Sequence, residues 1–248
     1  ESVSGDFYWI AQKNDDIILV VADSTGHGVP GALLSMLGQA YLNEIFNLEA
    51  TGSIPNPDEI LFKMREKVIS ALHQTGESKE AKDGMDMGIV ILNKKSSTIR
   101  YSGAHIPIYI VHREKVDHPP VAESDNPKRI RFQCINDPDS KRNTCITEVK
   151  GDRMPIGYHF RYDTTHEFTY HVFKLQQGDM VYLTTDGFGD QFGGENDCRF
   201  TIKRIKMLLS EIHILPIEYQ RDRIMESFTS WKGNSDQIDD ILFIGFRV

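Results

Sequence analysis

Residues 21–32, Val-Ala-Asp-Ser-Thr-Gly-His-Gly-Val-Pro-Gly-Ala, decide the fold of this 248-residue chain. They follow the apolar run Ile17 to Ala22, which is typical of a strand buried on both faces. Beyond the Gly-His-Gly turn, apolar residues recur at helical spacing from Val29 to Leu48, with Pro30 near the start, where a missing N–H costs nothing. The stretch therefore predicts a strand, a tight turn and a long core helix, with Asp23 where the strand ends.

Asp23 is one of four aspartates at the edge of an apolar, strand-like run. The others are Asp6 in Ser-Gly-Asp-Phe-Tyr, Asp186 in Thr-Thr-Asp-Gly and Asp239 in Ile-Asp-Asp-Ile. One such Asp is readily explained as a turn former, but four in one chain predict carboxylates gathered at one end of a sheet. Gathered carboxylates repel one another unless cations lie among them.

Composition excludes several classes of protein. The formal net charge of -8 disfavours a general binder of nucleic acid or of anionic membranes, because both need a basic surface. Three cysteines, Cys134, Cys145 and Cys198, are too few and too scattered for a disulfide framework or a thiolate zinc site, so a reducing, cytosolic setting is the default. No apolar run approaches the roughly 20 residues that span a bilayer.

The first residues do not form a signal peptide, and residue 1 is not Met. We therefore expect residues 1–248 to be a single domain, the C-terminal catalytic part of a longer signalling protein. Its expected location is the cytoplasm, or the cytoplasmic side of a membrane-attached sensor.

The remaining pattern favours an α+β fold built of hairpins and inserted helices over alternating parallel units. A second amphipathic helix should begin with an Asx cap at Asn56 and Pro57, and run to about His73. The polar, proline-containing stretch 112–143 should be a surface excursion, to which we assign no function. Strands are expected at 7–12, 17–22, 87–92, 98–102, 107–111, 168–175, 180–185 and 241–248, with 87–111 forming consecutive antiparallel strands, and helices at 199–212 and 217–231.

The acidic segments define a hard-oxygen donor set, which matches Mg or Mn and argues against copper or a thiolate zinc centre. Two divalent ions roughly 3.5 to 4 Å apart can deprotonate a bridging water and clamp a phosphoryl group for in-line attack. Such a site needs several carboxylates but no Ser, Cys or His nucleophile.

Five segments carry a resemblance to a known family: Val-Ser-Gly-Asp-Phe-Tyr-Trp, Val-Ala-Asp-Ser-Thr-Gly-His-Gly-Val-Pro-Gly-Ala, Tyr-Ser-Gly-Ala-His-Ile-Pro, Leu-Thr-Thr-Asp-Gly and Asp-Asp-Ile-Leu-Phe-Ile-Gly. In this order they resemble the SpoIIE and RsbU branch of the metal-dependent PPM serine/threonine phosphatases, over nearly the whole chain. The resemblance implies a four-layer αββα sandwich of two mainly antiparallel sheets flanked by helices. It also implies a dinuclear Mn or Mg site at one end of the sandwich, between the sheets.

The same resemblance assigns roles to individual residues. Asp23 would bridge both ions, and the carbonyl of Ser24 would bind one of them together with Asp6. Asp186 and Asp239 would hold the other ion, so that Asp23, Asp186 and Asp239 form the catalytic set. Asp86 in Gly-Met-Asp-Met-Gly matches the place of a ligand for a third, weaker ion.

Other matched residues are given supporting roles. Gly26 and Gly28 serve the turn after Asp23, by positive φ or close packing. His27 lies four positions after Asp23, not two as in eukaryotic relatives, which argues against it as the general acid. Asp240 is assigned to support Asp239, since adjacent strand residues face opposite ways. His105 in Ser-Gly-Ala-His, a permutation of the family's Asn-Ala-Gly-His, is left open between packing and function, and Asp186-Gly187 alone would be an ordinary turn.

The resemblance implies hydrolysis of phosphoserine or phosphothreonine on a protein by a metal-bridging water, with an anti-sigma-factor antagonist as a typical substrate. Two rivals remain open. One is a silent relative that acts as a regulatory binding module, and the other is a two-metal phosphodiesterase or nuclease, which the acidic surface disfavours. The oligomeric state, including a homodimer, is left open.

Overall fold

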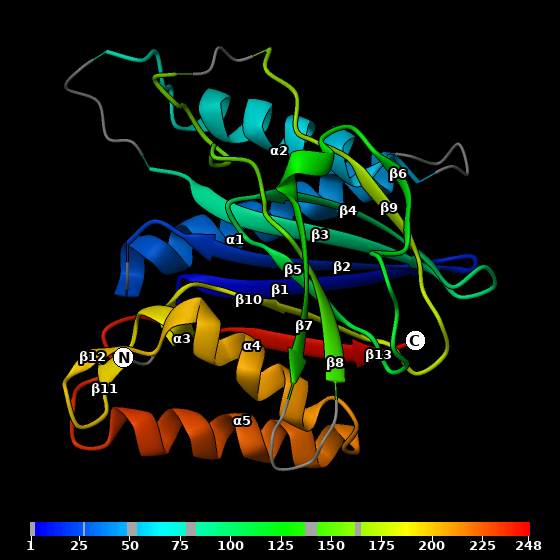
Figure 1. Ribbon diagram of the computed structural model, residues 1–248. Helices are drawn as coiled ribbons and strands as arrows, with labels where there is room; N and C mark the ends of the chain where they lie inside the picture. Colours follow the sequence, from blue (N-terminus) through cyan, green and yellow to red (C-terminus); the bar gives the residue numbers. More distant parts are fainter. Residues whose placement is uncertain (1–2, 27, 49–53, 78–82, 137–142, 162–164) are drawn as a thin grey trace.

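The computed structural model describes residues 3–26, 28–48, 54–77, 83–136, 143–161 and 165–248. Two antiparallel sheets pack face to face, and a layer of helices covers the outer face of each (Figure 1). The predicted αββα sandwich is confirmed.

The first sheet begins with two hairpins. Asp6 pairs with Asp23 and Lys13 with Asp16 across the first hairpin, whose turn is the polar Asn14-Asp15. Met87 pairs with Ala104 across the second. In spatial order the strands are β1 (Asp6–Lys13), β2 (Asp16–Ser24), β3 (Met85–Asn93), β4 (Thr98–Ala104), β9 (His171–Lys174) and β6 (Val121–Ser124).

The second sheet contains the C-terminal strands. In spatial order they are β13 (Phe243–Arg247), β10 (Met180–Thr184), β5 (Ile108–Val111), β8 (Asn143–Val149) and β7 (Ile130–Asn136). A small separate ribbon joins β11 (Phe192–Gly193) to β12 (Cys198–Arg199). Every paired strand in the described residues is antiparallel to its neighbours.

The helices divide between the two outer faces. Helices α1 (Gly28–Leu48) and α2 (Pro57–Ala71) cover the first sheet, whereas α3 (Gly187–Asp190), α4 (Thr201–Ile212) and α5 (Ile217–Lys232) lie on the side of the second (Figure 1). A single 3-10 turn occupies Pro127–Arg129. Helix α2 has Pro57 at its first turn as predicted, but Asn56 makes no side-chain capping bond, because its Oδ1 accepts a hydrogen bond from Arg100 instead (3.0 Å).

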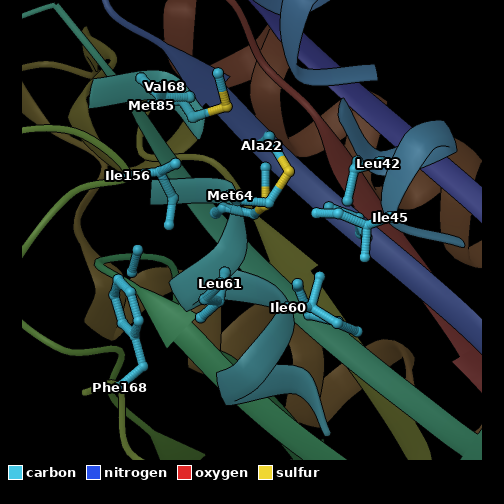
Figure 2. Packing of buried hydrophobic residues seen from close by; sticks show 14 of the residues in the cluster. Ala22, Leu42, Ile45, Ile60, Leu61, Met64, Val68, Met85, Ile156 and Phe168 are labelled. Atoms are coloured by element: carbon cyan, nitrogen blue, oxygen red, sulfur yellow. The ribbon is translucent and has the colours of Figure 1, made fainter. Parts of the chain in front are cut away.

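Alternation along β2 divides the core into layers. Ile18, Val20 and Ala22 face α1 and α2, while Leu19 and Val21 face the other sheet. Figure 2 shows the first of these layers, where residues of α1 and α2 pack around Ala22 and Met85. A third layer lies between the second sheet and α4 and α5. The double burial of β2 is the reason that its sequence is apolar at every position from 17 to 22.

One sequence expectation is wrong and another is incomplete. The run at 107–111 does not continue the β3–β4 meander, because β5 pairs with β8 and β10 in the other sheet. The stretch 112–143 lies at the surface as expected where the structure describes it, but it contains two strands that were not predicted, β6 and β7, which are edge strands with mainly exposed residues. Edge strands exposed to solvent carry polar residues, and so this pattern looks like a loop in the sequence. Residues 137–142 lie outside the described part.

The cysteine interpretation also needs correction. Cys134 on β7 lies directly opposite Cys145 on β8, and the two form a disulfide, although the sequence alone gave no reason to pair them. Cys198 is free.

None of the helices within the described ranges has the length and apolar content needed to cross a membrane.

Candidate metal centre

Three of the predicted aspartates lie in one row across the first sheet. Asp6 on β1 is opposite Asp23 on β2, and Asp23 is in turn opposite Asp86 on β3. Opposed residues project to the same face of a sheet, with neighbouring strands about 4.8 Å apart. Alternation along the strands places that face toward the second sheet, because Phe7, Ala22 and Met87 beside them face the helices. The row therefore opens into the space between the sheets, at one end of the sandwich.

The second sheet contributes the other aspartates at the same end. Because β10 and β13 are antiparallel, with Thr184 opposite Phe243, the end of β10 and the start of β13 lie together. Asp186 follows β10, and Asp239 and Asp240 precede β13, whose first residue is Phe243 rather than the expected Ile241. The strand alternation used to separate Asp239 from Asp240 therefore does not apply to them.

Hydrogen bonds tie the two sheets together at this end. The hydroxyl of Thr185 donates to Oδ2 of Asp6 (2.7 Å) and accepts from the backbone N–H of Leu242 (2.9 Å). Asp240 Oδ2 accepts from the N–H of Gly5 (2.8 Å), which anchors the start of β1. Thr185 belongs to the Thr-Thr-Asp-Gly motif, but it was not predicted as a site residue. Its hydrogen bonds to Asp6 and Leu242 depend on the tertiary structure, which brings these distant segments together.

Gly187 is required by the approach of the two aspartate segments. A Cβ atom there would lie 2.1 Å from the carbonyl oxygen of Asp240 and 3.2 Å from Cβ of Asp239. No side chain fits in that space, so the glycine lets α3 begin against the Asp239-Asp240 backbone. The common turn dipeptide thus has a specific steric role.

The turn after Asp23 agrees with its predicted geometry. Gly26 and Gly28 have φ of 83° and 66°, in the left-handed region that glycine adopts without strain. Ser24 is buried, and its N–H donates to the carbonyl of Gly5 (3.3 Å), which joins the turn to the start of β1. His27 lies outside the described residues.

The carboxylates of this end strongly perturb one another. Burial, followed by the charges of Asp6 and Asp186, raises the pKa of Asp23 to about 9. Burial and then Asp239 raise the pKa of Asp186 to about 6, and burial raises the pKa of Asp6. Without a cation, this group of acids holds protons that isolated aspartates would have released at neutral pH.

A divalent cation fits this donor set chemically. Oδ1 of Asp6 is buried and has no hydrogen-bond donor among the described residues, so one oxygen in the row is left for another ligand. Hard carboxylate and carbonyl oxygens suit Mg or Mn. In the described part of the chain, no three His, Cys, Asp or Glu side chains are close enough together to enclose an ion as they stand. The aspartates therefore match a divalent cation in the type of their oxygen donors and in their placement at one end of the sandwich. Their side chains would have to move closer together to bind it.

His105 is paired with the third aspartate of the row. Its Nδ1 lies 2.7 Å from Oδ1 of Asp86, and the hydrogen bond that this carboxylate accepts raises the pKa of His105. The residue has φ of 59°, and its N–H donates to the carbonyl of Asp152 (2.9 Å). His105 is thus not a residue of the apolar core, because it orients Asp86 from the loop between β4 and β5.

A cavity of about 730 Å³ opens beside the row and is lined by Asp23, Asp86, Asp186 and Thr185. Ile106, Ile202 and Ile205 form apolar parts of its wall. Basic residues from three other segments also line it: Arg129, Lys150, Arg153, Arg199 and Lys203. None of these basic residues could be recognised as a site residue from the sequence.

Comparison with known proteins agrees with this architecture. The sequence matches the family described as Stage II sporulation protein E (SpoIIE) over residues 13–127 and 137–248, and the chain belongs to that family. This confirms the predicted resemblance to the SpoIIE and RsbU branch. No curated protein sequence matches significantly.

Three solved structures share the fold over almost the whole chain. The SiaA-PP2C domain of Pseudomonas aeruginosa superposes with a TM-score of 0.75 and 28% identity, covering 99% of this chain and 81% of that one. The PP2C phosphatase domain of Bacillus subtilis SpoIIE, with a fragment of its regulatory domain, gives 0.64 and 15%, covering 100% of this chain but 59% of that one. RsbX in complex with magnesium gives 0.57 and 14%, covering 99% and 87%.

Proposed function

We propose that this chain is a metal-dependent serine/threonine protein phosphatase of the PPM type that acts in bacterial signal transduction. One observation carries the proposal: a row of aspartates from three strands faces Asp186 of the second sheet, at an end where burial and mutual repulsion raise their pKa values. Family membership supports it, as does the description of the SiaA and SpoIIE relatives as PP2C domains.

The residues that would hold two Mn or Mg ions are Asp6, Asp23, the carbonyl of Ser24, Asp186 and Asp239, with Asp86 as the candidate for a third. The magnesium complex of RsbX supports this choice of metal. Bound at these residues, divalent ions would supply an activated water and neutralise charge on the phosphoryl group.

Residues of the chain itself prepare the site. Thr185 fixes one oxygen of Asp6 and leaves the other free, and Asp240 holds the start of β1 against the second sheet. His105 orients Asp86 at the mouth of the cavity. The aspartate carboxylates already lie on two facing sheets at the place where a phosphorylated residue would enter, so little backbone movement is needed to bring them together.

In the same proposal the substrate is a phosphorylated regulatory protein, of which an anti-sigma-factor antagonist is the type expected from the resemblance. Residues 1–248 form one catalytic domain, located in the cytoplasm or on the cytoplasmic side of a membrane-attached sensor. The spacing of the carboxylates also favours a second candidate, a silent module that binds a partner without turnover, because no ligand cluster is closed among the described residues.

The test is hydrolysis of p-nitrophenyl phosphate with and without added Mn²⁺, together with calorimetric titration of Mn²⁺ into the protein. Wild type is compared with Asp186→Asn, which removes a ligand charge at nearly constant volume, and with Asp222→Asn, the same change at an exposed site on α5. We expect Mn²⁺-dependent turnover in wild type and Asp222→Asn and none in Asp186→Asn. Full turnover in Asp186→Asn would contradict the assignment, and Mn²⁺ binding without turnover in wild type would favour the silent module.

A further inference from the structure

The cavity beside the aspartate row has a basic side that the proposed chemistry does not use. Five basic residues line it, in a chain whose net charge is -8. We call the set Arg129, Lys150, Arg153, Arg199 and Lys203 the basic side. The same lining contains five acids, Asp23, Asp86, Glu148, Asp186 and Asp190. Three of these, Asp23, Asp86 and Asp186, belong to the centre that divalent ions would occupy. With their charge balanced by those ions, the basic side is left to bind an anionic ligand larger than a single phosphate.

Ion pairs within the described residues account for only two of the five. Arg129 is paired with Asp152 (2.9 Å) and Arg199 with Asp190 (3.1 Å). Glu148, the remaining acid near them, is paired with Lys206 from outside the cavity (3.0 Å). Lys150, Arg153 and Lys203 therefore have no ion-pair partner in the part of the chain that the structure describes.

The three cations are held on two walls of the cavity. Lys150 and Arg153 follow β8, whereas Lys203 is in the first turn of α4, which packs against β8 (Figure 1). Lys203 follows Thr201, whose φ of 75° is strained for a β-branched residue. Strain of this kind is often retained at binding sites.

The segment that bears Lys150 and Arg153 is fixed relative to the carboxylates. Asp152 donates its N–H to the carbonyl of Gly103 (2.7 Å) and accepts from the N–H of His105 (2.9 Å), the residue that orients Asp86. Gly151 allows this approach, since a Cβ there would lie 2.9 Å from the backbone of His105. The guanidinium of Arg129 donates to the carbonyl of Gly151 (2.7 Å). These contacts fix the backbone that carries Lys150 and Arg153, together with Arg129, relative to Asp86.

We propose that the basic side makes this phosphatase selective for phosphoproteins with Asp or Glu beside the phosphorylated residue. The inference rests on the proposed function and deepens it by naming the substrate class. Lys150, Arg153 and Lys203 bind the flanking carboxylates, and a cavity of about 730 Å³ has room for side chains next to the phosphorylated one. Charge complementarity of this kind sets specificity and association rate more than maximal affinity.

The test uses two phosphoserine peptides of equal length, one with Glu at the positions flanking phosphoserine and one with Gln, and p-nitrophenyl phosphate as a substrate without flanks. The measured quantity is the ratio of kcat/KM for the Glu peptide to that for the Gln peptide, with Mn²⁺ present. Variants are Arg153→Glu, Lys203→Glu and the double variant. Lys94→Glu is the matched control, because Lys94 follows the opposite end of β3 from Asp86, about 25 Å away along an extended strand.

We expect wild type to prefer the Glu peptide. Arg153→Glu and Lys203→Glu should each lower the ratio of kcat/KM values about threefold, and the double variant should lower it about tenfold. Lys94→Glu should leave the ratio unchanged. The preference should weaken as salt rises. Turnover of p-nitrophenyl phosphate with equal rates on both peptides would overturn the inference and leave the proposed function standing. Absence of turnover on all three substrates would refute the proposed function, and fluorescence anisotropy would then decide the inference, since equal binding of both peptides would overturn it.

Discussion

The cavity has two chemically different sides, and they come from different kinds of segment. The carboxylate side comes from strand ends between the two sheets, at one end of the sandwich, and the neighbours of these aspartates along the strands are buried. The basic side comes from the 3-10 turn, the segment after β8, and the stretch from β12 to the start of α4, and its five basic side chains are all exposed or partly exposed. Burial forces acids into contact on the first side and raises their pKa, whereas the basic side remains close to solvent. We therefore expect the carboxylate side to determine whether the protein hydrolyses phosphate esters at all. The basic side should determine which phosphorylated substrates it prefers.

The largest expected effect separates activity from stability at the carboxylate side. Asp23→Asn should lower turnover of p-nitrophenyl phosphate at least about 1,000-fold, equivalent to about 4 kcal/mol of transition-state stabilisation. The metal-free variant should be at least as stable as wild type to urea at neutral pH, because a neutral amide avoids the free-energy cost of protonating Asp23 when it is buried beside Asp6 and Asp186.

Asp16→Asn, at the other end of β2, is the matched control for that variant. Asp16 pairs with Arg100 (3.0 Å) and accepts from Asn93 (2.8 Å), so its loss should lower stability and spare activity. If Asp23→Asn lost stability and Asp16→Asn lost turnover, the proposed division between the two ends of the strand would be wrong.

The next effect tests the steric role of Gly187. Gly187→Ala should lower the free energy of unfolding by about 2–3 kcal/mol, because its Cβ would meet the carbonyl of Asp240 at 2.1 Å. In Gly189→Ala, two residues further along α3, the new Cβ would lie 3.5 Å from Ile205, an ordinary contact, and stability should change by less than about 0.5 kcal/mol. Urea unfolding of both variants measures the difference, and equal losses would contradict the close approach.

A pH-dependent effect probes the support behind the basic side. The buried His171 lies 2.8 Å from the hydroxyl of Ser124 and 3.3 Å from that of Thr169, and Thr169 donates to Asp152, the partner of Arg129. Burial lowers the pKa of His171 from 6.5 to about 4, against the opposing charges of Asp152 and Asp125.

His171 therefore stays neutral in the folded protein while the unfolded chain takes up a proton. Its contribution to stability is fully present above pH 6.5 and is lost as the pH falls toward 4, by about 2 kcal/mol between pH 6.5 and about pH 5. Urea unfolding as a function of pH should show a flatter profile for His171→Gln than for wild type. His118→Gln, at an exposed position, should retain the wild-type slope, and a slope unchanged by His171→Gln would show that His171 titrates normally.

The smallest effect concerns one hydroxyl in the same network. Thr169→Val removes a 2.9 Å hydrogen bond to Asp152 but keeps the backbone N–H that donates to the same oxygen, so it should cost about 1 kcal/mol. Thr98→Val, whose hydroxyl makes only a 3.4 Å contact with the carbonyl of Ser96, is the control. Equal costs in thermal or urea unfolding would show that the support of Asp152 is not specific.

The elements that could be predicted from the sequence are those with a local signature. The β1–β2 hairpin and helices α1, α2, α4 and α5 lie close to their expected ranges, because alternation, helical periodicity, prolines and polar turns act over short distances. β6 and β7 were missed, since edge strands carry polar residues and the excursion around them has several prolines. The buried strand β8 (Asn143–Val149) was also missed, because polar residues interrupt its short apolar pattern. The placement of β5 in the second sheet was also missed, because an apolar run does not specify its partner strand.

The residues that could carry metal chemistry are identifiable from the sequence alone, because each of the four aspartates stands at or just beyond the edge of an apolar, strand-like run and belongs to a motif that can be recognised without coordinates. Only the tertiary structure decided that Asp6, Asp23 and Asp86 form a row, that Thr185 joins Asp6 to the second sheet and that Gly187 fits beneath Asp240. It alone also brought Lys150 and Arg153 to the same cavity as Lys203, about fifty residues further along the chain. The physical reason is the sequence separation over which the interactions act. Periodicity and turn chemistry act within a few residues, whereas register between strands and packing of sheets are set by the whole buried core.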